Sequence, residues 1–142
     1  MPTTQQGVPK HYIRGASLRM WRDFFPNAQI YGVDISPTAI FQDERINTFL
    51  LNTKVEADMR QLIDNIGPDI DLVVDDGTHR ERSQLQAVRA LMPLLKNDVI
   101  YIIEDVTNPE SIKKELREYT CQTGLTSPKR IANLVIVKKK QV

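Results

Sequence analysis

The sequence has few cysteines, few aromatic side chains and no excess of charge of either sign. Cys121 is the single cysteine among 142 residues, which excludes an internal disulfide framework and a cysteine-based zinc site. The 19 basic and 18 acidic residues leave a formal charge of +1, so no overall field directs the chain to nucleic acid or to a membrane surface. We therefore expect neither nucleic acid nor a membrane among its partners.

Long apolar runs are also missing. No apolar stretch approaches the length of a membrane span, and residues 1–7 lack the apolar core of a signal peptide. A single cysteine fits a reducing compartment, so we expect a cytoplasmic protein. The length predicts one domain over residues 1–142. Pro2, Gly7 and Pro9 predict that residues 1–13 are weakly structured.

Two short apolar runs end abruptly in acidic side chains. The run at 72–74 is followed by Asp75 and Asp76, and the run at 99–103 by Glu104 and Asp105. Runs this short and rich in β-branched residues are typical of buried parallel strands. A helical segment lies between them, so a right-handed crossover would make the two strands parallel neighbours. Because ligands bind at the carboxyl ends of such strands, we expect the chemistry there.

Strands and helices alternate along the chain. The expected strands are 28–34, 46–51, 71–76, 99–105 and 131–137, the last one antiparallel at the sheet edge, and the expected helices are 16–25, 36–45, 53–66, 82–95 and one beginning near 107. Residues 124–128 are expected to form a loop. This alternation predicts an α/β fold with a Rossmann-like, doubly wound, mostly parallel sheet and helices on both faces. A flavodoxin-like arrangement is the runner-up.

Three of the expected helices begin with recognisable capping signals. Ser36 precedes Pro37, as an N-cap precedes a proline in the first turn. Thr53 and Glu56 have the spacing of a capping box. The segment Thr107–Glu110 contains asparagine and proline in the same order. Each signal predicts where its helix starts.

Asp34 ends the expected strand 28–34. In doubly wound folds a carboxylate at this place commonly accepts hydrogen bonds from the ribose hydroxyls of a nucleoside. A turn or cap residue before Ser36 and Pro37 would also be acidic here. The sequence does not decide between these two roles.

The acidic side chains at the two strand ends form a stronger group. Three carboxylates at one sheet edge, Asp76, Glu104 and Asp105, repel one another unless a cation neutralises them or one stays protonated. Oxygen ligands suit a hard ion such as Mg²⁺. Neighbouring residues alternate across a strand, so the four acids do not all point the same way unless the strand ends bend. Acidic caps of the following helices would explain one or two of them.

His79 follows Asp76 by three residues, past Gly77. The chain has room to turn there and to bring the imidazole back over the strand end. An ordinary pKa near 6.5 suits histidine to accept a proton from a hydroxyl. We expect His79 to be a general base, whereas His11 has no such neighbours.

Four segments together resemble the S-adenosylmethionine-dependent methyltransferases, in particular the macrocin O-methyltransferase and cephalosporin-hydroxylase-like group. The resemblance covers roughly residues 14–106. It rests on Gly15-Ala-Ser-Leu-Arg-Met-Trp, on Phe25-Pro-Asn-Ala-Gln-Ile-Tyr-Gly-Val-Asp34, on Asp75-Asp-Gly-Thr-His79 and on Ile103-Glu-Asp105. The Asp-Asp-Gly-Thr-His segment followed by an Ile-Glu-Asp strand end is the specific part.

The resemblance implies a function and a set of site residues. The implied reaction is transfer of the methyl group of S-adenosylmethionine, assisted by Mg²⁺, to a hydroxyl of a sugar-like or small-molecule acceptor, such as a glycoside. His79 would be the base. The implied metal ligands are Asp76, Glu104 and Asp105, and the implied cofactor-binding residues are Gly15, Ser17, Asp34, Asn52 and Asp75.

The first segment of the resemblance departs from the family pattern. The family has a strand beginning with an acid and glycine before the position of Gly15, where this chain has Val8-Pro-Lys-His-Tyr-Ile13. Only Gly15 and Ser17 remain of the loop that cradles the methionine part of the cofactor. We therefore expect an N-terminally truncated chain whose central strand is short or incomplete.

Two other functions stay open at this point. One is a degenerate, non-catalytic methyltransferase-fold protein that acts as a binding module. The other is a Mg²⁺-dependent hydrolase that uses the same acidic edge. An incomplete central strand would also leave strand edges exposed, which favours association, so we expect a homodimer.

Overall fold

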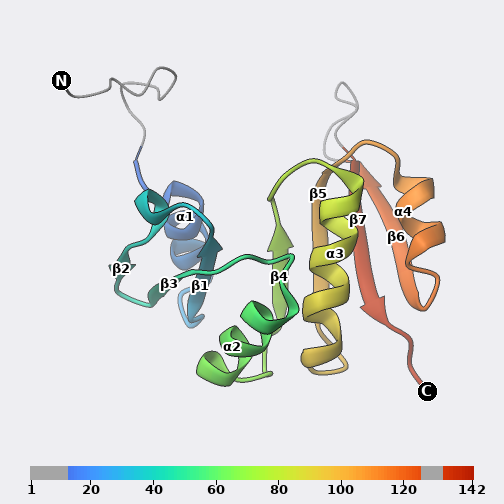
Figure 1. Ribbon diagram of the computed structural model, residues 1–142. Coiled ribbons are helices and arrows are strands. Elements are labelled where there is room, and N and C mark those ends of the chain that lie inside the picture. The colour runs from blue at the N-terminus through green and yellow to red at the C-terminus, as the bar shows by residue number, and fades with distance from the viewer. Residues whose placement is uncertain (1–12, 126–132) are drawn as a thin grey trace. The chain divides into compact units, whose positions relative to one another are not determined.

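The computed structural model describes residues 13–125 and 133–142 of the chain. The chain divides into two compact units, Met1–Leu51 and Asn52–Val142, and each is described by itself (Figure 1). The prediction of a weakly structured segment at residues 1–13 falls almost wholly outside the described residues. Of the expected central strand, Ile13 to Gly15 are described, and they form no strand. None of the described helices is long and apolar enough to cross a membrane.

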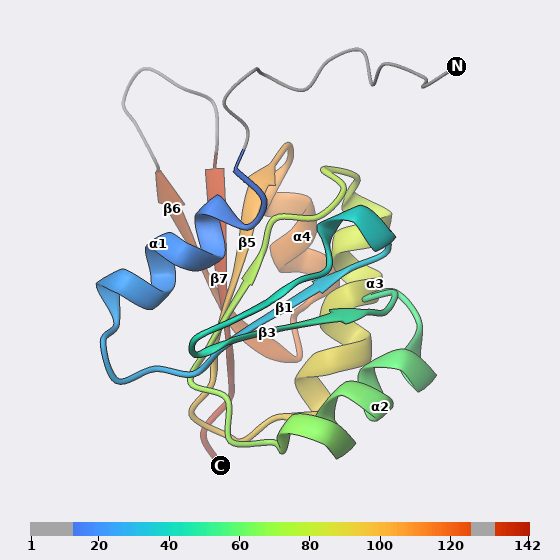
Figure 2. The ribbon, with the colours of Figure 1, turned by 90° about the vertical axis from the view of Figure 1, so that its left-hand side faces the viewer.

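The N-terminal unit is one helix on a small three-stranded sheet. Its elements are α1 (Ala16–Phe24), β1 (Ile30–Asp34), a short 3₁₀ helix (Pro37–Ala39), β2 (Gln42–Asp43) and β3 (Ile46–Leu50). The strand order is β1-β3-β2. β1 and β3 run parallel, side by side, and β2 is antiparallel to β3 (Figure 2). Gly32 lets α1 approach the sheet, because a Cβ there would lie 2.7 Å from the Leu18 side chain.

The C-terminal unit is a four-stranded sheet with helices. Its elements are α2 (Glu56–Ile66), β4 (Leu72–Asp75), α3 (Glu81–Leu91), a 3₁₀ helix (Met92–Leu94), β5 (Ile100–Val106), α4 (Pro109–Glu115), β6 (Tyr119–Leu125) and β7 (Asn133–Lys139). The strand order is β4-β5-β7-β6. β4 and β5 are parallel, whereas β7 is antiparallel to both of its neighbours.

The core of this unit lies between the sheet and the helices α3 and α4. α3 contacts β5 and α4, and α4 contacts β6 and β7, so both helices cover the same face (Figure 1). Apolar side chains from the helices and strands are almost fully buried there, among them Val88, Ile112, Leu116, Ile103 and Val135. This core supports β5, which carries Glu104 and Asp105 near its carboxyl end.

The α/β, Rossmann-like fold class predicted from the sequence is confirmed. The expected crossover β4–α3–β5 is present and makes β4 and β5 parallel neighbours. The predicted helix start near 107 is also confirmed, because the Asn108 side chain accepts a hydrogen bond from the Ser111 N–H. The expected sheet was mostly parallel, whereas the sheets of the described residues are mixed, because β2, β6 and β7 all pair antiparallel.

Two predictions in the N-terminal half of the chain are wrong. The expected helix over 36–45 is only the 3₁₀ helix Pro37–Ala39, after which the chain forms β2 and turns into β3. Pairing with β3 therefore overrides the local helix signal. The expected capping box at Thr53 is also absent, since α2 begins at Glu56 with Val55 as N-cap and no side-chain cap bond. Asp58 instead accepts from the Asn52 N–H at 2.7 Å.

The end of the chain also differs from expectation. The sequence does not predict β6, which contains Gly124 of the expected loop 124–128. Consequently β7 is antiparallel as expected, but it lies between β5 and β6 and not at the edge. The segment Tyr119–Leu125 has little apolar character of its own, and it forms a strand because β7 supplies the partner.

Candidate metal and methyl-transfer site

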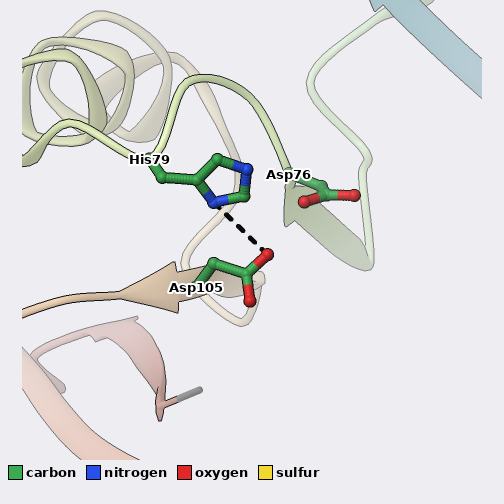
Figure 3. A group of neighbouring side chains, drawn as sticks. All are labelled: Asp76, His79 and Asp105. Atoms are coloured by element: carbon green, nitrogen blue, oxygen red, sulfur yellow. Dashed lines mark ion pairs between the residues drawn. The ribbon is translucent and has the colours of Figure 1, made fainter. Parts of the chain in front are cut away.

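The carboxyl ends of β4 and β5 lie at the same edge of the sheet. The parallel register pairs Asp75 with Ile103, so the residues just after this pair on each strand lie side by side. Three of them converge: Asp76, His79 and Asp105 each offer a ligand atom, and these atoms lie within 4.8 Å of one another (Figure 3). All three residues are exposed. They form the acidic cluster of this site.

A β-bulge places Asp105 in the acidic cluster. From Ile103 to Val106 β5 advances three residues, while β7 advances only two, from Val135 to Asn133, so β5 carries one extra residue. Asp105 has a φ of 51°, the left-handed conformation that aspartate tolerates better than most residues. A bulge locally interrupts the alternation of side chains across a strand. The side chains of Glu104 and Asp105 therefore do not follow the regular alternation of a strand.

His79 lies next to Asp105 in the acidic cluster. Its Nδ1 is 3.3 Å from Asp105 Oδ2, and the two side chains are 57% and 46% exposed (Figure 3). An ion pair this exposed contributes little to stability. Its consequence is orientation, because the contact turns the Nδ1 side of the ring toward the Asp105 carboxylate. The imidazole is also a ligand candidate for a metal ion.

Glu104 lies beside the acidic cluster and is half-buried. Burial raises the pKa of its carboxyl group, and the charges of Asp76 and Asp105 raise that pKa further. The metal set expected from the sequence was Asp76, Glu104 and Asp105, whereas the side chains that converge most closely in the described residues are Asp76, His79 and Asp105. Asp76 and Asp105 therefore lie near enough to Glu104 for their charges to act on its carboxyl group.

The donor chemistry of this edge fits a divalent cation. Carboxylate oxygens are the ligands that Mg²⁺ prefers, and the ion keeps several waters, so an exposed site suits it. A cation would also remove the repulsion that Glu104 experiences from its neighbours. The residues present therefore fit a hard metal ion.

The residues expected to bind the cofactor are divided between the two units. Gly15, Ser17 and Asp34 belong to the N-terminal unit, and Asn52 and Asp75 to the C-terminal unit. Gly15 is the N-cap of α1 with a φ of 71°, and Ser17 is exposed in the first turn of that helix. A helix N-terminus carries backbone N–H groups that favour an anion such as a carboxylate.

Asp34 is exposed at the carboxyl end of β1, as expected. Its Oδ1 accepts a hydrogen bond from the Ser36 N–H at 2.8 Å, so one oxygen does form the turn that the sequence allowed as an alternative. A carboxylate has several further lone pairs. The turn role and the ribose role are therefore compatible.

Asn52 and Asp75 both take part in turns. The Asn52 side-chain oxygen accepts from the Lys54 N–H at 3.0 Å. Asp75 accepts from the Tyr101 hydroxyl at 2.9 Å and from the Gly77 N–H at 3.2 Å. Burial raises the pKa of Asp75, and these two hydrogen bonds oppose that shift.

Tyr101 and Gln84 are two residues near the site that sequence reasoning missed. Both are polar and buried, at 2% and 4% exposed. Tyr101 lies within the apolar run of β5, and Gln84 has helical spacing from Val88 and Leu91 in α3. The available signal was a polar side chain at a position that the pattern assigns to the core.

No family model matches the chain. Curated proteins do: the chain is 38% identical over 92 residues to an 8-demethyl-8-alpha-L-rhamnosyl tetracenomycin-C 2'-O-methyltransferase of Streptomyces olivaceus, an alignment of 65% of this chain and 24% of the relative. It is 35% identical over 92 residues to the demethylmacrocin O-methyltransferase of Streptomyces fradiae, over 65% of this chain and 23% of that protein. The chain thus spans about a quarter of the length of the curated relatives it matches.

Solved structures give the same result for the fold. The MycE methyltransferase from the mycinamycin biosynthetic pathway, in complex with Mg and SAH, superposes with a TM-score of 0.67 and 25% identity over 94% of this chain and 42% of that one. A SAM-dependent methyltransferase from Anabaena variabilis has a TM-score of 0.68 and 14% identity, covering 89% of this chain and 74% of its own.

The fold is therefore that of the class I S-adenosylmethionine-dependent methyltransferases. Within this class, the resemblance to the macrocin-type O-methyltransferases that the sequence predicted is confirmed.

Proposed function

We propose that this chain carries out S-adenosylmethionine-dependent, Mg²⁺-assisted O-methylation of a hydroxyl on a small glycoside. The observation that carries the proposal is the convergence of Asp76, His79 and Asp105 at the ends of two parallel strands, in a chain similar to sugar O-methyltransferases. The structure of the MycE methyltransferase in complex with Mg, SAH and mycinamycin VI supports the choice of cofactor, metal and acceptor class.

The acidic edge would hold the metal. When bound, Mg²⁺ supplies a Lewis acid that orients oxygens of the acceptor, and S-adenosylmethionine supplies the methyl group. Asp76 and Asp105 are the proposed ligands, with Glu104 as the third carboxylate. Its position next to Asp105 at the end of β5 supports this role.

His79 would move the proton. Asp105 lies 3.3 Å from its Nδ1 and fixes the ring so that Nε2 faces away from that carboxylate. In this role His79 accepts the proton of the acceptor hydroxyl as the oxygen attacks the methyl group. Holding the acceptor and the base in this geometry supplies much of the rate enhancement.

The residues that the resemblance implies for the cofactor keep that role as proposals. In the N-terminal unit, Asp34 would accept from the ribose hydroxyls, and the N-terminus of α1 at Gly15 and Ser17 would bind the methionine part. In the C-terminal unit, Asn52 and Asp75 are the proposed cofactor contacts. We further propose that residues 1–142 form one domain, that the protein is cytoplasmic and homodimeric, and that it binds neither nucleic acid nor membranes.

Calorimetric titration of the purified chain with S-adenosylmethionine, with and without Mg²⁺, tests this proposal. Asp34→Ala is expected to abolish cofactor binding, and His79→Ala to preserve it while stopping methyl transfer to a glycoside acceptor. Asp76→Asn is expected to abolish the Mg²⁺ dependence. Asp64→Asn, an exposed acid in α2, is the matched control and should behave as the parent chain does.

The outcomes separate this function from its alternatives. No binding at millimolar S-adenosylmethionine contradicts the methyltransferase proposal. Cofactor binding without transfer to any glycoside would instead support a non-catalytic binding module. Mg²⁺-dependent hydrolysis of a model phosphoester, without S-adenosylmethionine, would support a hydrolase.

A further inference from the structure

Two buried polar side chains form hydrogen bonds next to the acidic cluster, one at the end of β4 and one at the end of β5. Tyr101 lies in β5 and is 2% exposed, and Gln84 lies in α3 and is 4% exposed. Buried polar groups are stabilised only when they find hydrogen-bond partners. The hydrogen-bond partners of Tyr101 and Gln84 lie in the two segments that carry the proposed metal ligands.

Tyr101 supports the turn after β4. Its hydroxyl donates to Asp75 Oδ2 at 2.9 Å, while Asp75 Oδ1 accepts from the Gly77 N–H at 3.2 Å. One oxygen of Asp75 therefore accepts from a core side chain, and the other accepts from the backbone of the loop. Asp76 lies between these two fixed points, and the loop continues to His79. The hydroxyl of Tyr101 thus anchors the segment from which both side chains come.

Gln84 supports the bulge in β5. Its Nε2 donates to the backbone carbonyl of Glu104 at 3.2 Å, next to Asp105 with its left-handed φ of 51°. A bulge interrupts the hydrogen-bond ladder, so a donor from outside the sheet is needed to satisfy a carbonyl there. The Gln84 amide supplies that donor and keeps the backbone in the conformation that presents Asp105.

We propose that Tyr101 and Gln84 are positioning residues of the metal site: Tyr101 sets Asp76 and His79 through Asp75, and Gln84 sets Asp105 through the bulge. This inference rests on the proposed function, because it takes the acidic cluster as the metal site. Both would act through other residues of the site and not as ligands themselves. The alternative is that both residues only fill the core, a role for which the tyrosine hydroxyl and the glutamine amide are unnecessary.

The test removes the hydrogen bonds and preserves the volume. Tyr101→Phe deletes one hydroxyl, and Gln84→Met replaces the amide by an apolar group of similar length. Tyr119→Phe in β6 and Gln86→Met on the exposed side of α3 are matched controls with the same chemical changes. Far-UV circular dichroism and thermal melting establish that each variant is folded.

Mn²⁺ replaces Mg²⁺ as a spectroscopic probe of the site in the full chain. Loss of partners that orient metal ligands typically weakens metal binding 10- to 100-fold. We expect the Mn²⁺ dissociation constant, measured by electron paramagnetic resonance, to rise roughly tenfold or more in Tyr101→Phe and in Gln84→Met. Both controls should stay within about twofold, since they do not alter the ligand geometry.

A second measurement needs no metal. In Tyr101→Phe, the backbone amide signals of Gly77 and His79 should shift in nitrogen–proton NMR spectra, and in Gln84→Met those of Asp105 should shift, each beyond the change that its control produces. Variants that lower the melting temperature but leave both the Mn²⁺ affinity and these signals as in the controls would overturn the inference. If the parent chain binds no Mn²⁺, the proposed metal site fails, and the amide signals alone decide the positioning role.

Discussion

Replacing Gly15 by alanine is expected to destabilise the N-terminal unit strongly. Gly15 has a φ of +71°, and a Cβ there would lie 2.1 and 2.3 Å from two ring atoms of Phe41. The left-handed backbone costs an L-residue about 1–2 kcal/mol. Forcing a methyl group into the occupied space costs about 1–3 kcal/mol more. The expected loss in the free energy of unfolding is therefore about 2–5 kcal/mol.

Urea unfolding followed by the fluorescence of Trp21 measures this loss. Trp21 is the only tryptophan of the chain, it lies in α1, and its ring stacks on Phe25 with centroids 5.9 Å apart. The signal therefore reports unfolding of the unit that contains Gly15. Adding Phe41→Leu to Gly15→Ala should recover part of the loss by making room for the methyl group, while the backbone strain remains.

Two other glycines serve as matched controls. Gly67 has a φ of +82° and nothing within 4 Å of a Cβ, so Gly67→Ala should show strain alone, about 1–3 kcal/mol. Gly124→Ala would meet Leu134 at an ordinary 3.6 Å and should change stability by less than about 1 kcal/mol. Circular dichroism follows both, because they lie in the other unit. A Gly15→Ala variant no less stable than Gly124→Ala would refute this reasoning.

Three further predictions concern hydrogen bonds and charge. Arg45→Lys should lower the free energy of unfolding, measured by Trp21 fluorescence, by roughly 2–4 kcal/mol. The reason is that the Arg45 guanidinium donates to three carbonyls at 2.9–3.0 Å, which an ammonium cannot span. An unchanged unfolding midpoint would contradict this prediction. Asn108→Ala should lower the free energy of unfolding in denaturant by about 1 kcal/mol. Thr53→Ala should leave it almost unchanged, because of these two residues only Asn108 caps its helix. Equal effects of the two substitutions would argue against the cap assignment. The pKa of Asp75 is raised above its ordinary 3.8, so ionisation of this carboxyl group opposes folding. Asp75→Asn should therefore gain stability relative to the parent chain as pH rises from about 4 to 7. A stability difference that is constant over this range would count against burial of the charge.

The sequence was most informative where a pattern is repeated over several residues. The apolar runs before Asp75 and Glu104 and the helical stripe between them predicted the β4–α3–β5 crossover, which the structure has. Such segments are predictable because every residue of the period favours the same element. Short segments were predicted less well. Ser36 and Thr53 carry local cap signals, yet neither begins an α-helix, because pairing of β2 with β3 and the Asp58 contact to Asn52 compete with those signals.

The sequence by itself determined that acidic side chains and one histidine lie at the carboxyl ends of two strands, since the apolar runs and the acids that end them are properties of the pattern. Only the tertiary structure decided which of them meet. The bulge after Ile103 and the left-handed backbone at Asp105 bring Asp105 to His79 and leave Glu104 beside them. Their supports, Tyr101 and Gln84, come from elsewhere in the chain. A bulge and a buried hydrogen bond arise from contacts between segments, so no local pattern in the sequence specifies them.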